Sequence, residues 1–119
     1  MEPIQIEQVA AAALAGQALL TRHLALTFLR ETKNFSDVPP PTVTEPDILA
    51  ATAAFVELFA QRRGQQPPTW TAEIERHDEP IFLFRCKPES NTYRLCLETA
   101  PQPLGQRGFY APYNYLTFV

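Results

Sequence analysis

The clearest hydrophobic pattern in the chain runs from Thr44 to Gly64 and predicts a helix. Thr44 can accept hydrogen bonds from the N–H groups of the first turn, and Asp47 stands three residues later, where a capping box has its second member. Gly64 can adopt the left-handed conformation that ends a helix. At about 100° per residue, apolar side chains cover most of the circumference, so other segments should pack around this helix. Four positions are expected to face water: Ala50, Ala54, Glu57 and Gln61.

A second helical pattern extends from Ile6 to Glu31 and is interrupted only by Gly16. A glycine inside a helix costs up to about 1 kcal/mol relative to alanine, which the strong helix formers around it can offset. The pattern therefore predicts one continuous helix. Leu19 and Leu26 lie outside its main apolar stripe. The favoured interpretation is that another part of the chain covers them, and the alternative is a partner surface.

The segment between the two helical patterns, residues 32–43, contains three consecutive prolines and predicts a partly extended loop. It is too long for a helix-turn-helix motif, whose turn takes about three or four residues. It can instead return the chain so that the two helices pack antiparallel, with Phe35 as a plug between them.

The chain after Gly64 is rich in proline and aromatic residues. The pair Pro67 and Pro68 ends the helix and directs Trp70, which we expect to pack on the central helix near Phe59. Residues 72–79 are acidic and polar and favour a short helix. The tail, residues 100–119, is too apolar to be loose, and we expect it to lie across the helices, over the two leucines of the first helix.

Two short runs in this region favour a β-hairpin. Residues 80–86 are apolar and rich in β-favouring side chains, residues 87–91 are typical of a turn, and residues 92–98 alternate weakly. The last run could also form a short helix that ends before Pro101, because periodicity over seven residues does not decide. The predicted fold class is mainly α (α+β), in one domain of residues 1–119: two long antiparallel helices, a wrapping C-terminal segment and a small hairpin.

The net charge of −3 over 119 residues gives no general attraction to nucleic-acid phosphates. No apolar run approaches the roughly 20 residues of a membrane-spanning helix, and Glu2 stands where a signal peptide would carry positive charge. We therefore expect a cytoplasmic protein that binds neither nucleic acid nor membrane.

The residues capable of catalysis form no recognisable set. A hairpin would place Cys86 and Cys96 across from each other, yet reduced, buried thiols are favoured in the cytoplasm. A catalytic cysteine would need His23 or His77 as its base. The acidic residues before His77 lack the spacing of metal ligands, so a solvated acidic turn is the favoured interpretation. No catalytic, cofactor-binding or metal-binding residue is predicted.

Short motifs in the last two-thirds of the chain carry a resemblance to known proteins. They are Arg63-Gly64, Pro67-Pro68-x-Trp70-Thr71, Glu79-Pro80-x-Phe82, Pro101 and Arg107-x-Phe109 with Asn114-x-Leu116. The chain thereby resembles a loose group of small uncharacterised bacterial proteins with an Ala-rich helix, an Arg/Gly stop and a Pro-x-Trp-Thr turn. Some members are thought to be the smaller partners of toxins in toxin–antitoxin or defence operons. No active-site residue comes with the resemblance, and Ala111-Pro112-Tyr113 interrupts its closing motif.

These observations predict a non-enzymatic protein-binding module, and the resemblance implies an antitoxin-like neutralising partner. Exposed apolar residues would anchor the partner, and acidic residues would steer its basic surface. The predicted partner-binding residues are Leu19, Leu26, Glu73, Glu75, Tyr113 and Phe118. One alternative is a homo-oligomeric structural protein that uses the same leucines. The other is a small ligand-binding protein or enzyme with a pocket between tail and helices, using His77 or Cys86.

Overall fold

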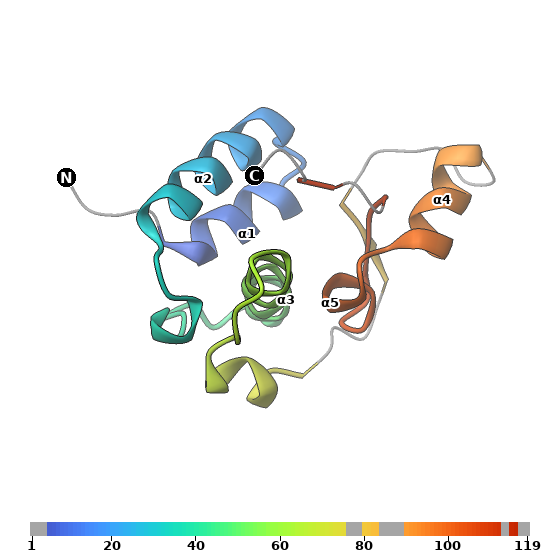
Figure 1. Ribbon diagram of the computed structural model, residues 1–119. Helices are drawn as coiled ribbons and strands as arrows, with labels where there is room; N and C mark the ends of the chain where they lie inside the picture. The colour runs from blue at the N-terminus through green and yellow to red at the C-terminus, as the bar shows by residue number, and fades with distance from the viewer. Residues whose placement is uncertain (1–4, 76–79, 84–89, 113–114, 117–119) are drawn as a thin grey trace.

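The computed structural model describes residues 5–75, 80–83, 90–112, 115 and 116 (Figure 1). The described part is mainly helical with one small parallel sheet, which confirms the mainly α class. None of its helices combines the length and apolar character needed to cross a bilayer. In chain order the elements are α1 (Ile6–Leu14), α2 (Ala18–Glu31), the 3-10 helix η1 (Phe35–Asp37), α3 (Pro46–Arg62), the 3-10 helix η2 (Thr69–Glu73), β1 (Ile81–Phe82), α4 (Asn91–Thr99), α5 (Gln102–Gly105) and β2 (Phe109–Tyr110).

Helix α3 is the centre of the molecule, as its sequence predicts. Its side chains from Ala50 to Ala60 are all buried except that of Glu57. Ala50 and Ala54 are therefore not solvent-facing, and that expectation was wrong because segments pack on every side of the helix. The expected capping box is also absent: the N-cap is Glu45, without a side-chain hydrogen bond. The Asp47 carboxylate accepts instead from the neighbouring N–H of Ile48, at 2.8 Å.

Two helices end in the same glycine geometry. At the end of α3, Gly64 has φ +66°, and the N–H of Gln65 donates to the carbonyl of Ala60 at 2.8 Å. At the end of α1, Gly16 has φ +75°, and the N–H of Gln17 donates to the carbonyl of Ala12 at 3.1 Å. Both are Schellman-type ends in which a left-handed glycine lets the chain satisfy the last carbonyls. The stop at Gly64 is confirmed.

The continuous helix predicted over residues 6–31 is wrong, because the chain reverses at Gly16. Helices α1 and α2 lie side by side and run in opposite directions (Figure 1). Each then turns an apolar face to the common core: Val9 and Ala13 from α1, Ala25 and Phe28 from α2. A straight helix could not bury both faces in one core, so the gain in burial outweighs the continuity of the helix.

The long antiparallel pair expected between the first helix and α3 is also corrected. Figure 1 shows α3 nearly end-on while α1 and α2 run across the view, so α3 crosses this pair. The antiparallel neighbours are α1 and α2, since the tight turn at Gly16 joins them, whereas the linker before α3 is long enough for a change of direction.

The first half of the linker over residues 32–43 is fixed by burial and by hydrogen bonds. Phe35 is fully buried, which confirms it as a plug. The Gln65 side chain accepts from the N–H of Phe35 at 2.9 Å and donates to the carbonyl of Lys33 at 3.1 Å. Trp70 is half-buried against the core that contains Phe59, and its indole N–H donates to the carbonyl of Val38 at 2.8 Å. Two residues that follow α3, Gln65 and Trp70, thus fix the first half of the loop that precedes it.

The predicted hairpin is wrong. Strand β1 pairs in parallel with β2, with Ile81 opposite Phe109 and Phe82 opposite Tyr110. The second half of the expected hairpin is helix α4, the alternative left open by its sequence. The Ser90 hydroxyl accepts from the N–H of Tyr93 at 3.1 Å and caps this helix, which gives it a local reason to form. The Phe82 ring stacks on the Tyr93 ring, with centroids 4.7 Å apart.

Candidate functional site

The most exposed large apolar side chains on the N-terminal helices are at the start of α2. Leu19 is 84% exposed and Leu20 is 43% exposed. The tail was expected to cover Leu19, and its described part leaves it open to solvent. Leu26 lies two helical turns further along the same face and is half-buried. The two predicted leucine anchors thus share one face of α2, with Leu19 the more accessible.

The turn between α1 and α2 explains why these leucines point outward. All residues from 15 to 20 are exposed, and we call this segment the elbow surface. Thr21, the next residue, is buried, and its hydroxyl donates to the carbonyl of Gln17 at 2.9 Å. This inward orientation of Thr21 fixes the first turn of α2. Because neighbouring helical residues are rotated by about 100°, Leu19 and Leu20 are left on the outside.

The structure does not bring the acidic part of the predicted site to the leucines. Glu73 and Glu75 are exposed, at and just after the end of η2. In Figure 1, η2 and α2 lie on opposite sides of α3. One flat contact therefore cannot include both sets. The other two predicted anchors, Tyr113 and Phe118, lie outside the described residues.

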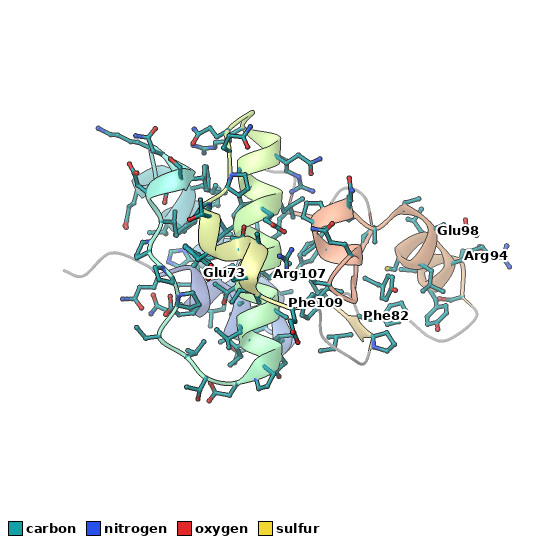
Figure 2. The ribbon with its side chains drawn as sticks, turned by 90° about the horizontal axis from the view of Figure 1, so that it is seen from below. Glu73, Phe82, Arg94, Glu98, Arg107 and Phe109 are labelled. Atoms are coloured by element: carbon teal, nitrogen blue, oxygen red, sulfur yellow. The ribbon has the colours of Figure 1, made fainter. Side chains whose placement is uncertain are left out.

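Sequence reasoning missed a buried ion pair between Arg107 and Glu57. The two side chains are 6% and 17% exposed, and the guanidinium donates to both carboxylate oxygens of Glu57. It also donates to the carbonyl of Thr71 at 2.7 Å, and the Gln106 amide donates to Glu57 at 3.2 Å. Figure 2 shows Arg107 beside α3. Glu57, expected to face water, instead joins α3 to the tail, and Arg107 extends this link to η2.

This ion pair brings opposite charges together in the interior of the protein, and its role is structural. The guanidinium and the carboxylate compensate each other's charge, and Arg107 also donates to the carbonyl of Thr71, which is how proteins tolerate a buried ion pair. The only sequence signal for it was an arginine within the apolar tail. That signal cannot identify the partner, because Glu57 precedes Arg107 by several elements.

The candidate catalytic residues are not assembled in the part of the chain that the structure describes. Cys96 is buried on α4 and His23 is exposed on α2, and these helices lie at opposite ends of the molecule in Figure 1. Cys86 and His77 fall outside the described residues. Among the described residues, no group of three or more His, Cys, Asp and Glu is arranged to hold a metal ion.

The shifted pKa values follow from packing. Burial against α3 raises the pKa of Tyr115 to about 12, and its ring centroid lies 6.2 Å from that of Phe55. Burial also lowers the pKa of Arg62, whose guanidinium donates to the carbonyl of Leu116 at 3.0 Å. Tyr115 is a neutral packing group at physiological pH, and both residues fasten the tail to the central helix.

Two hollows bear on the ligand-binding alternative. One of about 280 Å³ lies between α3 and the tail, where a pocket was expected, and its walls include Gln61, Gln65, Gln102 and Gln106. A larger one of about 540 Å³ lies between the start of α1, the end of α2 and the 32–43 loop. The second has a more apolar lining and was not anticipated from the sequence.

Comparison of the chain with protein-family models, with curated proteins and with solved structures found no match.

Proposed function

We propose that this chain is a non-enzymatic protein-binding module that docks a partner on the elbow surface and the adjoining outer face of α2. The observation that carries the proposal is the 84% exposure of Leu19 beside the exposed Leu20. Exposed single leucines are ordinary, but here two adjacent leucines follow Ala15 and Ala18 in a segment that is exposed throughout. The small residues would let a partner approach the backbone closely.

Burial of these side chains supplies a driving force for association. A leucine moved fully from water into an apolar contact contributes about 1.5–3 kcal/mol. Leu19 and Leu20 would therefore act as the central anchors, and the half-buried Leu26 would extend the contact along α2. The residues that would bind the partner are on a helix fixed by the core below, so little ordering is needed on binding.

The resemblance to partners of bacterial toxins suggests what the module binds. We propose a toxin-like protein with a basic surface, in the bacterial cytoplasm. Glu73 and Glu75 lie across α3 from the elbow surface, so their contribution would be long-range steering rather than contact. Such steering acts over about 8–10 Å at physiological salt, and it would raise the association rate at low salt.

The test is a tagged pull-down from the native host with a matched pair of variants. Leu19→Asp places a charge at the centre of the proposed contact. Leu97→Asp is the control, because Leu97 is 44% exposed and lies on α4, away from α2. The proposal expects one partner near one-to-one stoichiometry that is lost with Leu19→Asp and kept with Leu97→Asp, while both variants unfold at the wild-type temperature.

Other outcomes of the experiment contradict the proposal. Capture that survives Leu19→Asp, or that disappears equally with Leu97→Asp, would rule out the elbow surface as the specific contact. Light scattering on the purified protein distinguishes the homo-oligomeric alternative, which uses the same leucines, from binding of a different protein. A dimer that dissociates with Leu19→Asp would show that the partner is a second copy of this chain. A monomer would exclude the homo-oligomeric alternative.

A further inference from the structure

The groove at the far end of α2 is independent of the elbow surface. It opens where the start of α1, the end of α2 and the 32–43 loop meet. The 14 residues of α2 span about 20 Å, so the groove and Leu19 are at opposite ends of one helix. Its volume of about 540 Å³ lies within the range of about 300–1,000 Å³ that small-molecule sites occupy.

The walls of the groove are fixed by hydrogen bonds from three separate elements. Gln65 holds the loop at Lys33 and Phe35, and Trp70 holds the carbonyl of Val38. The Glu7 carboxylate accepts from the N–H of Thr42 at 3.1 Å and ties the far end of the loop to α1. The prolines between these points restrict the backbone further. The groove is therefore preformed, which lowers the entropic cost of filling it.

The floor of the groove is apolar. Ile6, Phe28 and Val38 lie at its base and are 2%, 4% and 8% exposed, and Pro39 and Pro40 form a wall. These side chains carry no polar groups. An apolar ligand group that covers them therefore leaves no polar atom of the protein without a hydrogen bond. The floor thus selects a hydrocarbon chain or ring.

The rim of the groove is acidic. Its charged residues are three carboxylates, Glu7, Glu31 and Asp37, and one cation, Lys33. Glu31 and Thr32 also mark the C-terminal end of α2, where the helix dipole favours a positive charge. At the start of α1, the N–H of Gln5 donates to the side chain of Gln8 at 2.8 Å, so this N–H is already engaged. The balance of charge disfavours an anion and favours a cation.

From this floor and rim we infer that the groove binds a small organic cation, an ammonium group on a short hydrocarbon chain or ring. The hydrocarbon lies on Phe28 and Val38, and the ammonium group lies among the rim carboxylates, near Asp37. Nothing in this inference depends on the elbow surface or on its partner.

The test uses three probes with the same phenylbutyl body and different head groups. They are 4-phenylbutylammonium, the neutral 4-phenylbutan-1-ol and the anionic 4-phenylbutyrate, titrated into the full chain and followed by amide chemical shifts in NMR spectra. We expect the ammonium to bind with a dissociation constant of about 1 mM, as suits a ligand of so few atoms. The largest shifts should come from Lys33, Asn34 and Thr42. The alcohol should bind more weakly, and the carboxylate most weakly.

Variants of exposed rim residues test the electrostatic part without threatening the fold. Asp37→Asn should weaken the binding of the ammonium about two- to fivefold, and Lys33→Met should strengthen it by a similar factor, as expected for solvent-screened charges. Glu98→Gln, on α4, is the control and should have no effect. Equal affinity for the three probes, shifts outside the groove or weaker binding by Lys33→Met would each overturn the inference. Tighter binding of the dipeptide N-acetyl-Phe-Lys-amide than of the ammonium would also overturn it, in favour of a protein segment.

Discussion

Helix α3 buries ten of its side chains and begins without a side-chain cap, whereas α4 buries Cys96 alone and begins with the Ser90 cap. In Figure 1, α3 is surrounded by other elements and α4 projects at one end of the molecule. Leu95 and Leu97, on either side of Cys96, remain 39% and 44% exposed. The comparison shows that tertiary burial can replace a missing local signal, and that a local signal matters most where burial is small.

The largest expected effect is on the free energy of unfolding when one apolar side chain is truncated in α3 and one in α4. Phe59→Ala should lower the free energy of unfolding by about 3–5 kcal/mol, because it leaves a cavity where the fully buried ring packs against Phe28 and Phe55. Leu95→Ala should lower it by less than about 1 kcal/mol, since much of its surface already faces water. Urea unfolding measures both values. Equal losses would show that α4 is as deeply integrated as α3.

A smaller effect concerns the ion pair that fastens the tail to α3. Arg107→Met should lower the free energy of unfolding by about 3 kcal/mol, because it leaves the largely buried Glu57 carboxylate without its cation. Urea unfolding again provides the measurement.

The matched control for the ion pair is the double variant Glu57→Met with Arg107→Met. It should recover part of the loss, since it removes both charges together with the Arg107 Nε, which is buried without a hydrogen-bond partner among the described residues. A double variant less stable than Arg107→Met would contradict this account.

The smallest effect should be confined to α4. Ser90→Ala removes the hydroxyl that accepts from the N–H of Tyr93 and should cost about 1 kcal/mol in local helix stability. We expect faster amide exchange in α4 and unchanged exchange in α3, because regions of low burial open locally. Ser36→Ala, at an exposed position of η1, is the control. Exchange that accelerates equally in α3 would mean that the two helices open as one unit.

The features that the sequence predicted correctly are those with a local pattern. The apolar circumference of α3, the stop at Gly64 and the plug at Phe35 can each be read within a few residues. Gly16 has the same left-handed backbone conformation as Gly64, but the sequence on both sides of Gly16 favours helix. Whether such a glycine is tolerated or ends the helix depends on the core against which the two halves can pack, and no local pattern contains that information.

The features that the sequence did not predict depend on distant partners. Strand β1 finds its partner in β2 rather than in the adjacent run, and Glu57 finds Arg107 rather than water. Of the candidate site, Leu19 could be identified from its position off the main apolar stripe, although the favoured interpretation had the tail cover it. Its separation from Glu73 could not, because it depends on how α2 and η2 are placed around α3.

The parallel pairing of β1 with β2 has a consequence for the order in which the protein folds. During synthesis, Ile81 leaves the ribosome long before Phe109, so β1 remains without its ladder until α4 and α5 have been translated. Closing the loop between β1 and β2 costs conformational entropy before the strand contacts can stabilise it. The pairing is therefore a late event in folding. A nascent chain that stops before α5 would thus lose the pairing of β1 and also the cover of α3 by α5, so the centre of the fold is closed only after α5 has been made.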